Sequence, residues 1–162
     1  MKKVSEVQGC EGCPHNKVPT IDLVYAAGLI DGEGCFCLTK KTAKGKHYSP
    51  AYEGHLVVCM TNEPVINWLH RTFGGWKTTH RKLKSGKQLY RWQALGAHAG
   101  CLSLLLSRFL KVKKKQAKLF FRFKRTMSSY KLKITGVKTL RISAKEIKRR
   151  EMLRLEMRAL NA

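Results

Sequence analysis

Hydrophobic residues recur at helical spacing in some segments of this 162-residue chain and alternate with polar residues in others. The first pattern is typical of amphipathic helices, and the second of half-buried strands. Helices are predicted over residues 20–31, 62–73, 97–110 and 114–127, and from 143 onward. Strands are predicted over 35–42, 53–61, 76–84 and 88–95. This order predicts an α+β fold, αββαββα with an antiparallel sheet, followed by C-terminal helices.

Residues that start and stop helices support these boundaries. Thr20 and Asn62 are predicted N-caps, because a side-chain oxygen there can accept a hydrogen bond from the first turn. Gly74–Gly75 is expected to end the second helix. Ser143 and Glu146 have the spacing of a capping box at the start of the last helix.

Alternation assigns each strand residue to one of two faces of the sheet. The core face is predicted to carry Phe36, Leu38, Leu56, Val58, Trp76, Tyr90 and Trp92. The other face of the first hairpin would carry Cys37, Thr39, Lys41, Glu53, His55, Val57 and Cys59. The second hairpin adds Lys77, Thr79, Arg81, Lys84, Lys87, Arg91 and Gln93. In the C-terminal helices, Met127 is expected on the buried side and Arg150 on the charged side.

The charge of the chain points to a polyanionic partner. Its formal net charge is +23, although its hydrophobic content of 43% is that of a globular protein. Between Leu23 and Lys145 the acidic residues are Asp31, Glu33, Glu53 and Glu63 and no others. An acid pair in a basic region suggests a metal site facing phosphates, although an acid at a helix end can also be a simple cap.

No run of 18 apolar residues and no signal peptide is present, so we expect an intracellular protein without a membrane span. Its six cysteines are then expected to be thiols. Residues 1–19 form a polar arm in which Cys10 and Cys13 are followed by His15. This spacing is compatible with part of a Zn²⁺ site, with a disulfide within the arm, or with free thiols.

The block from Ala26 to Gly34, AAGLIDGEG, combines small residues with two acids. Ala27, Gly28 and Gly32 would give one side of the helix a stripe of small residues, against which a second backbone can pack closely. The sequence contains no second copy of the block. We therefore expect a symmetric homodimer in which two such helices meet.

This block resembles the signature of the LAGLIDADG homing endonucleases. It departs from the commonest form at its first residue and in having Glu33 at the eighth position, where aspartate is usual. The resemblance implies that Glu33 and the carbonyl of Gly32 hold Mg²⁺ or Mn²⁺. It assigns a more structural role to Asp31. It also implies that two antiparallel sheets form a saddle that binds double-stranded DNA.

The resemblance extends over residues 23–123 and covers two further candidates. Lys113, in the segment FLKVKKKQA, corresponds to the family's active-site lysine; alternatively, it is one of a run of solvated lysines. Asn62 falls where the family often has a glutamine that orients water, although it is also a helix cap. The loop residues Lys44, Lys46, His47 and Tyr48 would contact DNA together with the outward strand residues.

The sequence therefore suggests an endonuclease core over residues 20–128, between the N-terminal arm and a basic extension over 129–162. The expected activity is a staggered double-strand break in a long, nearly palindromic DNA site. Two alternatives share the fold and the charge: an RNA-binding intron maturase, and a DNA-binding protein without catalytic activity.

Overall fold

The computed structural model describes residues 17–42, 49–128 and 142–162. The elements are, in chain order, α1 (Thr20–Glu33), β1 (Gly34–Lys41), β2 (Ala51–Met60), α2 (Glu63–Phe73), β3 (Trp76–Lys82), β4 (Gln88–Leu95), α3 (Gly96–Leu106), α4 (Lys114–Ser128) and α5 (Ala144–Leu160). The predicted fold class and element order are confirmed. The third helix ends earlier than predicted, because the chain turns between Leu106 and Leu110.

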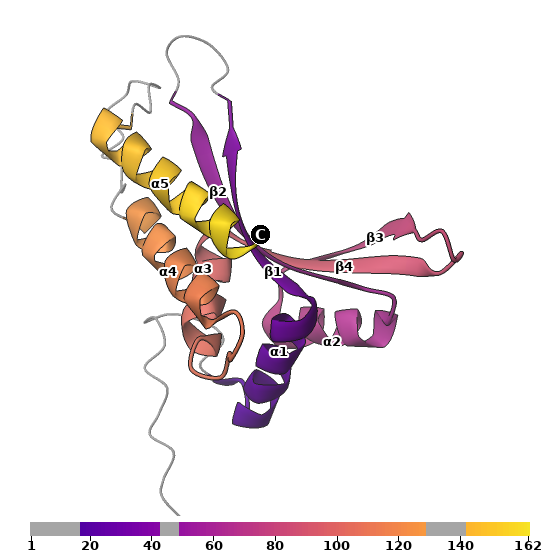
Figure 1. Ribbon diagram of the computed structural model, residues 1–162. Coiled ribbons are helices and arrows are strands. Elements are labelled where there is room, and N and C mark those ends of the chain that lie inside the picture. The colour runs from indigo at the N-terminus through magenta and orange to yellow at the C-terminus, as the bar shows by residue number, and fades with distance from the viewer. Residues whose placement is uncertain (1–16, 43–48, 129–141) are drawn as a thin grey trace, which may run out of the picture.

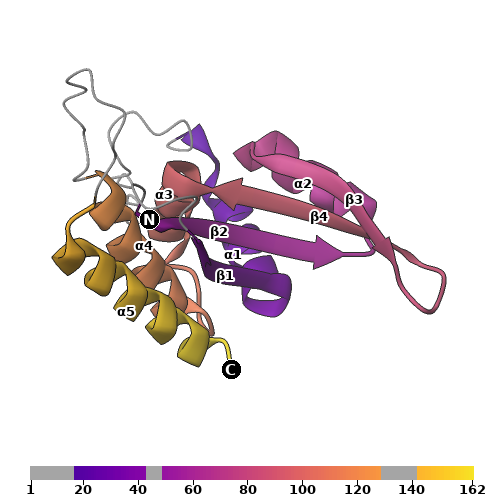
Figure 2. The ribbon, with the colours of Figure 1, turned by 90° about the horizontal axis from the view of Figure 1, so that it is seen from above.

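The four strands form one antiparallel sheet in the order β1-β2-β4-β3. Helices α1, α2 and α3 lie against one face of this sheet, while α4 and α5 run side by side at its β1 edge (Figure 1). The view from above, in Figure 2, shows strands lying in front of α1, α2 and α3. The sheet therefore has one covered face and one open face. None of the helices in the three described segments is long and apolar enough to cross a bilayer.

The core lies between the covered face of the sheet and the helices. Phe36, Leu56 and Trp92 contribute from the strands and are almost completely buried. Leu23 and Ile30 of α1 join the same cluster, together with the apolar residues of α3 and α4. Burial of such side chains is the main stabilising contribution to a fold of this size.

The helix ends follow the predicted capping chemistry in three of four places. Asn62 Oδ1 accepts from the N–H of Val65 at 3.2 Å, and Ser143 Oγ accepts from the N–H of Glu146 at 3.2 Å. Gly74 ends α2 with a φ of 68°, a conformation that glycine adopts without strain. The prediction for Thr20 is wrong: α1 already begins at Thr20, and Pro19 occupies the N-cap position.

The predicted face assignment of β3 is wrong by one residue. In the observed register Trp76 lies opposite Gln93, and Lys77 lies opposite Trp92. Directly opposed residues point to the same side of a sheet. Trp76 is therefore on the open face, with 65% of its surface exposed, and Lys77 is on the covered side. Every residue of β3 is exposed, so the pattern of hydrophobic residues does not show which of them point to which face of the sheet.

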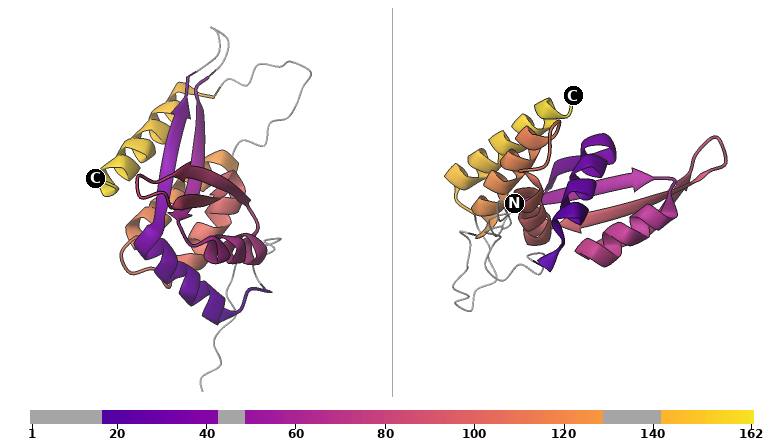
Figure 3. Two further views of the ribbon diagram at one scale, coloured as in Figure 1. Left: turned by 90° about the vertical axis from the view of Figure 1, so that its right-hand side faces the viewer. Right: turned by 90° about the horizontal axis from the view of Figure 1, so that it is seen from below.

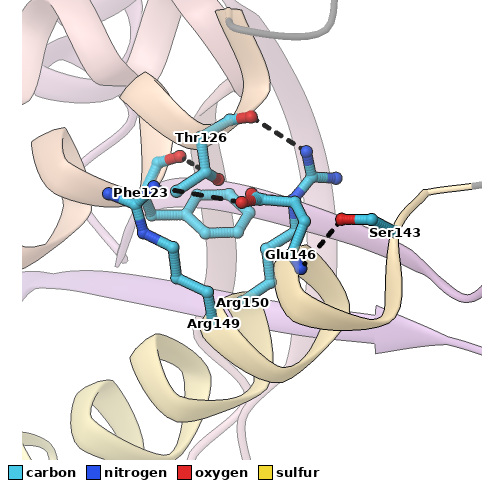
Figure 4. A network of polar contacts seen from close by, with 6 residues as sticks. All are labelled: Phe123, Thr126, Ser143, Glu146, Arg149 and Arg150. Atoms are coloured by element: carbon cyan, nitrogen blue, oxygen red, sulfur yellow. Dashed lines mark hydrogen bonds and ion pairs between the residues drawn. The ribbon is translucent and has the colours of Figure 1, made fainter.

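A buried arginine joins the two C-terminal helices (Figure 4). Arg150 is only 3% exposed; it donates to Glu146 Oε1 at 2.9 Å and to the carbonyl oxygen of Thr126 at 2.9 Å. The prediction that Arg150 lies on the charged outer side is wrong, because these acceptors offset the cost of burying its charge. Met127 is 40% exposed, contrary to its predicted burial.

Gly54 provides a test of this packing. A Cβ atom built at Gly54 would lie 2.5 Å from Cζ of Phe120, whose ring is fully buried. Gly54→Ala is expected to lower the free energy of unfolding by about 1–3 kcal/mol, because the ring cannot move without disturbing the core. Urea denaturation measures the change.

The matched control is the same substitution in a Phe120→Leu background, where the ring is absent. The cost of Gly54→Ala should fall there, as expected for residues in direct contact. An equal cost in both backgrounds would contradict the proposed clash.

Candidate active site and nucleic-acid interface

The signature ends with an exposed acid at the junction of α1 and β1. Glu33 is the last residue of α1, and its side chain is exposed. The chain passes directly into β1 at Gly34, where a Cβ would lie 2.7 Å from the carbonyl oxygen of Ile30. A glycine is thus needed for the helix to lead into the strand without a loop. This close passage fixes Glu33 beside the first residues of β1.

Asp31 and Lys113 join the end of α1 to the start of α4. The Asp31 carboxylate accepts from the N–H of Lys111 at 2.7 Å and from the N–H of Lys113 at 2.8 Å. In return, the Lys113 ammonium donates to the carbonyls of Ile30 at 3.1 Å and Asp31 at 2.8 Å. The Asp31 carboxylate thus lies at the N-terminus of α4, and the Lys113 ammonium lies at the C-terminus of α1. The macrodipole of each of these helices favours the charge at that end.

The same contacts set the ionisation of Asp31. Partial burial raises the pKa of its carboxyl, but the N–H groups of residues 111–113 together lower it further, below its ordinary value of 3.8. The carboxylate is therefore charged at neutral pH. Both of its oxygens are occupied by backbone donors. Asp31 is accordingly placed to hold the fold around Glu33 and Lys113.

Of the predicted site residues, Asp31 and Lys113 are in direct contact, and Gly32 and Glu33 follow Asp31 at the end of α1. Asn62 lies beyond the end of β2, and its side-chain oxygen is engaged as the N-cap of α2. Within the described segments, no three His, Cys, Asp or Glu side chains are grouped closely enough to hold a metal ion. A cation beside Glu33 would thus need further ligands from water, phosphate or a second copy of the chain.

The open face of the sheet is apolar and rich in thiols at its centre. One row across the strands consists of Cys35, Val57, Gln93 and Trp76, in that order. The rows on either side contain Cys37 with His55 and Cys59 with Arg91. Trp76 was predicted in the core and is instead a large apolar group on this face.

Charges on this face are arranged so that cations prevail. Glu53 forms a 2.7 Å ion pair with Lys41 and lies 3.7 Å from His55 Nε2. Burial lowers the pKa of His55, against the opposing effect of Glu53, so its ring is neutral at pH 7. Thr39 Oγ1 lies 3.1 Å from the same ring nitrogen. The single acid of the first hairpin is therefore paired.

The two thiols of β1 touch each other. Cys35 Sγ and Cys37 Sγ are 3.1 Å apart, and neither residue is fully buried. The hydrogen bond from Cys37 lowers the pKa of the Cys35 thiol to about 6, more than partial burial raises it, and raises the pKa of Cys37. Sequence reasoning missed this pair, although two cysteines separated by one residue on a strand always share a face.

The side chain of Asn161 lies against the same stretch of β1. Its amide nitrogen donates to the carbonyl of Phe36 at 2.8 Å and is 3.9 Å from Cys35 Sγ. Asn161 follows directly after α5, and Figure 1 shows that end of the chain beside β1. No sequence pattern marks this contact, since it joins residues 125 positions apart.

Some predicted contact residues lie elsewhere. Lys77 and Thr79 lie opposite Trp92 and Tyr90, and Lys77 Nζ donates to Asn67 Oδ1 of α2 at 2.6 Å. The expectation that they share a face with Arg91 and Gln93 is wrong. Arg81, Lys84 and Lys87 are exposed along the second hairpin and its turn. Cys10, Cys13, Lys44, Lys46, His47 and Tyr48 lie outside the described residues.

The small-residue stripe of α1 divides between two environments. Ala27 is 1% exposed and packs in the core of its own chain, so it is not available to a second helix. Gly28 and Gly32 are exposed, and a Cβ on either would meet no atom of residues 17–42, 49–128 or 142–162 within 4 Å. They lie on one side of the helix with Ile21, Val24 and Tyr25, which are 72%, 47% and 51% exposed. This side of α1 is apolar and open.

Homing endonucleases are among the solved structures that superpose on this chain. The chain superposes on I-CvuI, solved with its target and calcium, with a TM-score of 0.68 and 16% identity over 86% of this chain and 82% of that one. For the archaeal intron-encoded I-Vdi141I complexed with DNA, the TM-score is 0.70 and the identity is 16%, over 87% of this chain and 84% of that one. For the LAGLIDADG homing endonuclease I-GzeII in complex with its DNA target, the TM-score is 0.61 and the identity is 13%, over 85% of this chain and 43% of that one.

These similarities identify the fold of the chain as that of the LAGLIDADG homing endonucleases, as its signature block suggested. Neither a protein-family model nor a curated protein sequence matches the chain. The chain spans most of I-CvuI and I-Vdi141I but less than half of I-GzeII.

Measurements of the free energy of unfolding can distinguish the structural role of Asp31 from the role expected for Glu33. Asp31→Asn should lower the free energy of unfolding by about 1–3 kcal/mol, because an amide cannot accept both backbone N–H groups as a carboxylate does. Glu33→Gln, two residues further along the same helix, should leave it within about 0.5 kcal/mol.

Urea denaturation at several pH values checks this pair. Because the folded pKa of Asp31 is depressed, its contribution is complete above its ordinary pKa and is lost as the pH falls through the lower, folded value. The difference between wild type and Asp31→Asn should thus be constant from pH 5 to 8 and shrink in acid. Equal stabilities at pH 7 would show that the link to α4 is unimportant.

Proposed function

We propose that this protein is an endonuclease that hydrolyses both strands of a DNA duplex as a homodimer. One observation carries the proposal: an exposed carboxylate, Glu33, ends α1 directly after the two carbonyls that bind the ammonium of Lys113, at the point where the chain enters the open sheet. The expected product is a staggered break in a long, nearly palindromic site. The DNA complexes of I-CvuI and I-Vdi141I, which share the fold, support this interpretation.

The open sheet face is suited to duplex DNA. Strands and hairpins can enter the major groove, where base edges carry sequence information. Arg91 and Gln93 supply groups that hydrogen-bond to bases, and the exposed cations of the second hairpin supply phosphate contacts. A net charge of +23 favours association with any polyanion, so the groups at the centre of the face are left to discriminate between sequences.

The oxygen groups at the end of α1 fit a hard divalent cation. Mg²⁺ and Mn²⁺ prefer carboxylate and carbonyl oxygens and retain several waters. Glu33 and the carbonyl of Gly32 would hold the ion, because C=O groups in the last turn of a helix lack intrahelical partners. Such an ion supplies Lewis-acid stabilisation of negative charge on phosphate oxygens.

Lys113 would act beside this acid. Its ammonium lies in the negative field of the α1 C-terminus, where two carbonyls fix its position. A fixed cation at this place can stabilise the charge that develops on a phosphate or polarise an attacking water. Asn62 is a weaker candidate for orienting that water, because its oxygen already serves the α2 cap.

The apolar side of α1 is the proposed dimer interface. Gly28 and Gly32 lack side chains where a second helix would approach, and the exposed Ile21 and Val24 would be covered. A symmetric pair of α1 helices would bring two copies of Glu33 near the two-fold axis. Each copy would then serve one strand of the duplex.

Cleavage tests the proposal directly. The protein is incubated with Mg²⁺ and a library of duplexes with a randomised central region, and newly formed ends are captured and sequenced. Glu33→Gln should lower the cleavage rate by at least about 10²–10³-fold, the scale on which loss of one electrostatic stabiliser acts. Binding to the selected duplex, measured by fluorescence anisotropy, should be retained.

Glu63→Gln is the matched control, since Glu63 is an exposed acid at the start of α2 and should leave cleavage intact. Enrichment of a bound sequence without new ends would indicate a binding protein instead. Undiminished cutting by Glu33→Gln would remove its assigned role.

The dimer interface has its own test. Gly28→Leu should lower the apparent mass in sedimentation equilibrium from dimer to monomer, because the new side chain separates the two helices. Lys118→Leu adds the same side chain to an exposed position of α4 and should leave the dimer intact. A dimer that persists in Gly28→Leu would place the interface elsewhere.

A further inference from the structure

The thiols of Cys35 and Cys37 are brought together on the open face of β1, immediately after Glu33. Their sulfur atoms are 3.1 Å apart, although residues two apart on a strand are separated by about 6.7 Å between Cα atoms. Both side chains have therefore turned toward each other. Both residues are partly exposed, so reagents in solution can reach them.

The surroundings of the pair favour a modifiable site over a purely structural one. Cys35 lies opposite Val57 and Cys37 opposite His55, so the pair is on the side of the sheet that no helix covers. The amide nitrogen of Asn161 lies 3.9 Å from Cys35 Sγ. The core on the other side of β1 is filled by Phe36 and Leu38 and needs neither thiol.

We propose that Cys35 and Cys37 form a dithiol modification site, which hydroperoxides oxidise to a disulfide and which in that state blocks DNA cleavage. The oxidation itself follows from the position of the two sulfurs. Its effect on cleavage rests on the function proposed above.

The chemistry has two steps. One thiol attacks the outer oxygen of a hydroperoxide, which breaks the O–O bond and gives a sulfenic acid and an alcohol, or water if the oxidant is hydrogen peroxide. The second thiol then attacks that sulfur, an S–S bond forms, and the hydroxyl leaves as water. The peroxide gains the two electrons that the dithiol loses. A dithiol reductant reverses the change by thiol–disulfide exchange.

The disulfide would disturb the site through the backbone of β1. Bridged cysteines have Cα atoms 4.4–6.8 Å apart, and most lie well below the spacing of about 6.7 Å in a strand. Forming the bond therefore shortens β1 where it pairs with Val57 and His55. Glu33 and Gly34 directly precede this stretch, so the bond would displace the carboxylate from the position at which the proposed function requires it.

The sequence allows the site to be isolated chemically. Trypsin releases residues 18–40 as one peptide that contains Cys35 and Cys37 and no other cysteine. The full-length protein is treated with hydrogen peroxide, its remaining thiols are blocked with N-ethylmaleimide, and the tryptic peptides are weighed. The peptide should be unlabelled and lighter by two hydrogen atoms. In Cys37→Ser, dimedone should instead trap a sulfenic acid on Cys35.

Two results would overturn the site. One is a peptide that takes up two maleimides after a treatment that oxidises the other cysteines. The other is a disulfide from Cys35 or Cys37 to a different cysteine or to a second chain.

Cleavage of a selected duplex is measured on the same samples, each compared with its own reduced form. Peroxide should lower the wild-type rate by about a hundredfold, the cost of a displaced catalytic group, and dithiothreitol should restore it. Cys101→Ser, which alters a thiol on α3, should behave as wild type. Cys37→Ser should lose the reversible inhibition.

Full activity with the disulfide formed would overturn the proposed block. If the reduced protein cuts no duplex, the proposed endonuclease function fails, while the peptide masses still decide whether the site exists.

Discussion

Reciprocal hydrogen bonds between Asp31 and Lys113 join the two segments of the candidate site: each side chain binds backbone groups of the other's segment. They join the C-terminus of α1 to the N-terminus of α4 through groups 82 residues apart in the chain. Because each charge meets the helix end of opposite polarity, the contact satisfies backbone groups that both helices leave unpaired. Glu33 follows two residues after Asp31, at the end of the same helix, and none of these hydrogen bonds involves it. In the function proposed here, the two acids of the signature therefore serve different purposes: Asp31 stabilises the fold and Glu33 serves the chemistry.

The open sheet face suggests how a strongly basic protein with the proposed function can discriminate between DNA sequences. Its charges lie along the second hairpin and at the far end of β1. Figure 3 (left) shows the arrangement of these strands, with the hairpin of β3 and β4 facing the viewer. The centre carries thiols, Val57 and the exposed Trp76, which bind phosphate poorly. Peripheral cations give affinity for any duplex, whereas short-range contacts at the centre depend on the bases presented. The half-buried Val57 and the exposed Trp76 fit a surface that is covered in the proposed complex with DNA.

The sequence was sufficient for the element order, the sheet, three helix caps and the location of Glu33 next to a strand, because each rests on local periodicity or a short motif. It failed where local pattern carries no information. The phase of β3 could not be inferred, since all its residues are exposed. The burial of Arg150 depends on acceptors from Glu146 and from Thr126, which lies in another helix. The contact of Asn161 with Phe36, and the role of Lys113 as a donor to α1, are long-range and become visible only in three dimensions.

The small residues of α1 lie on two sides of the helix that have different surroundings. Ala27 faces inward and lets the helix pack closely beneath the sheet, while Gly28, its neighbour in sequence, faces outward, and no atom of the described residues lies within 4 Å of a Cβ built there. A glycine that meets no atom of its own chain gains nothing for the monomer, and in a helix it is destabilising by about 0.5–1 kcal/mol relative to alanine. In the proposed dimer, a second backbone occupies this space and offsets that cost. The inner side of α1 therefore explains the fold of one chain, and its outer side has the shape that the proposed packing against a second copy of the same helix needs.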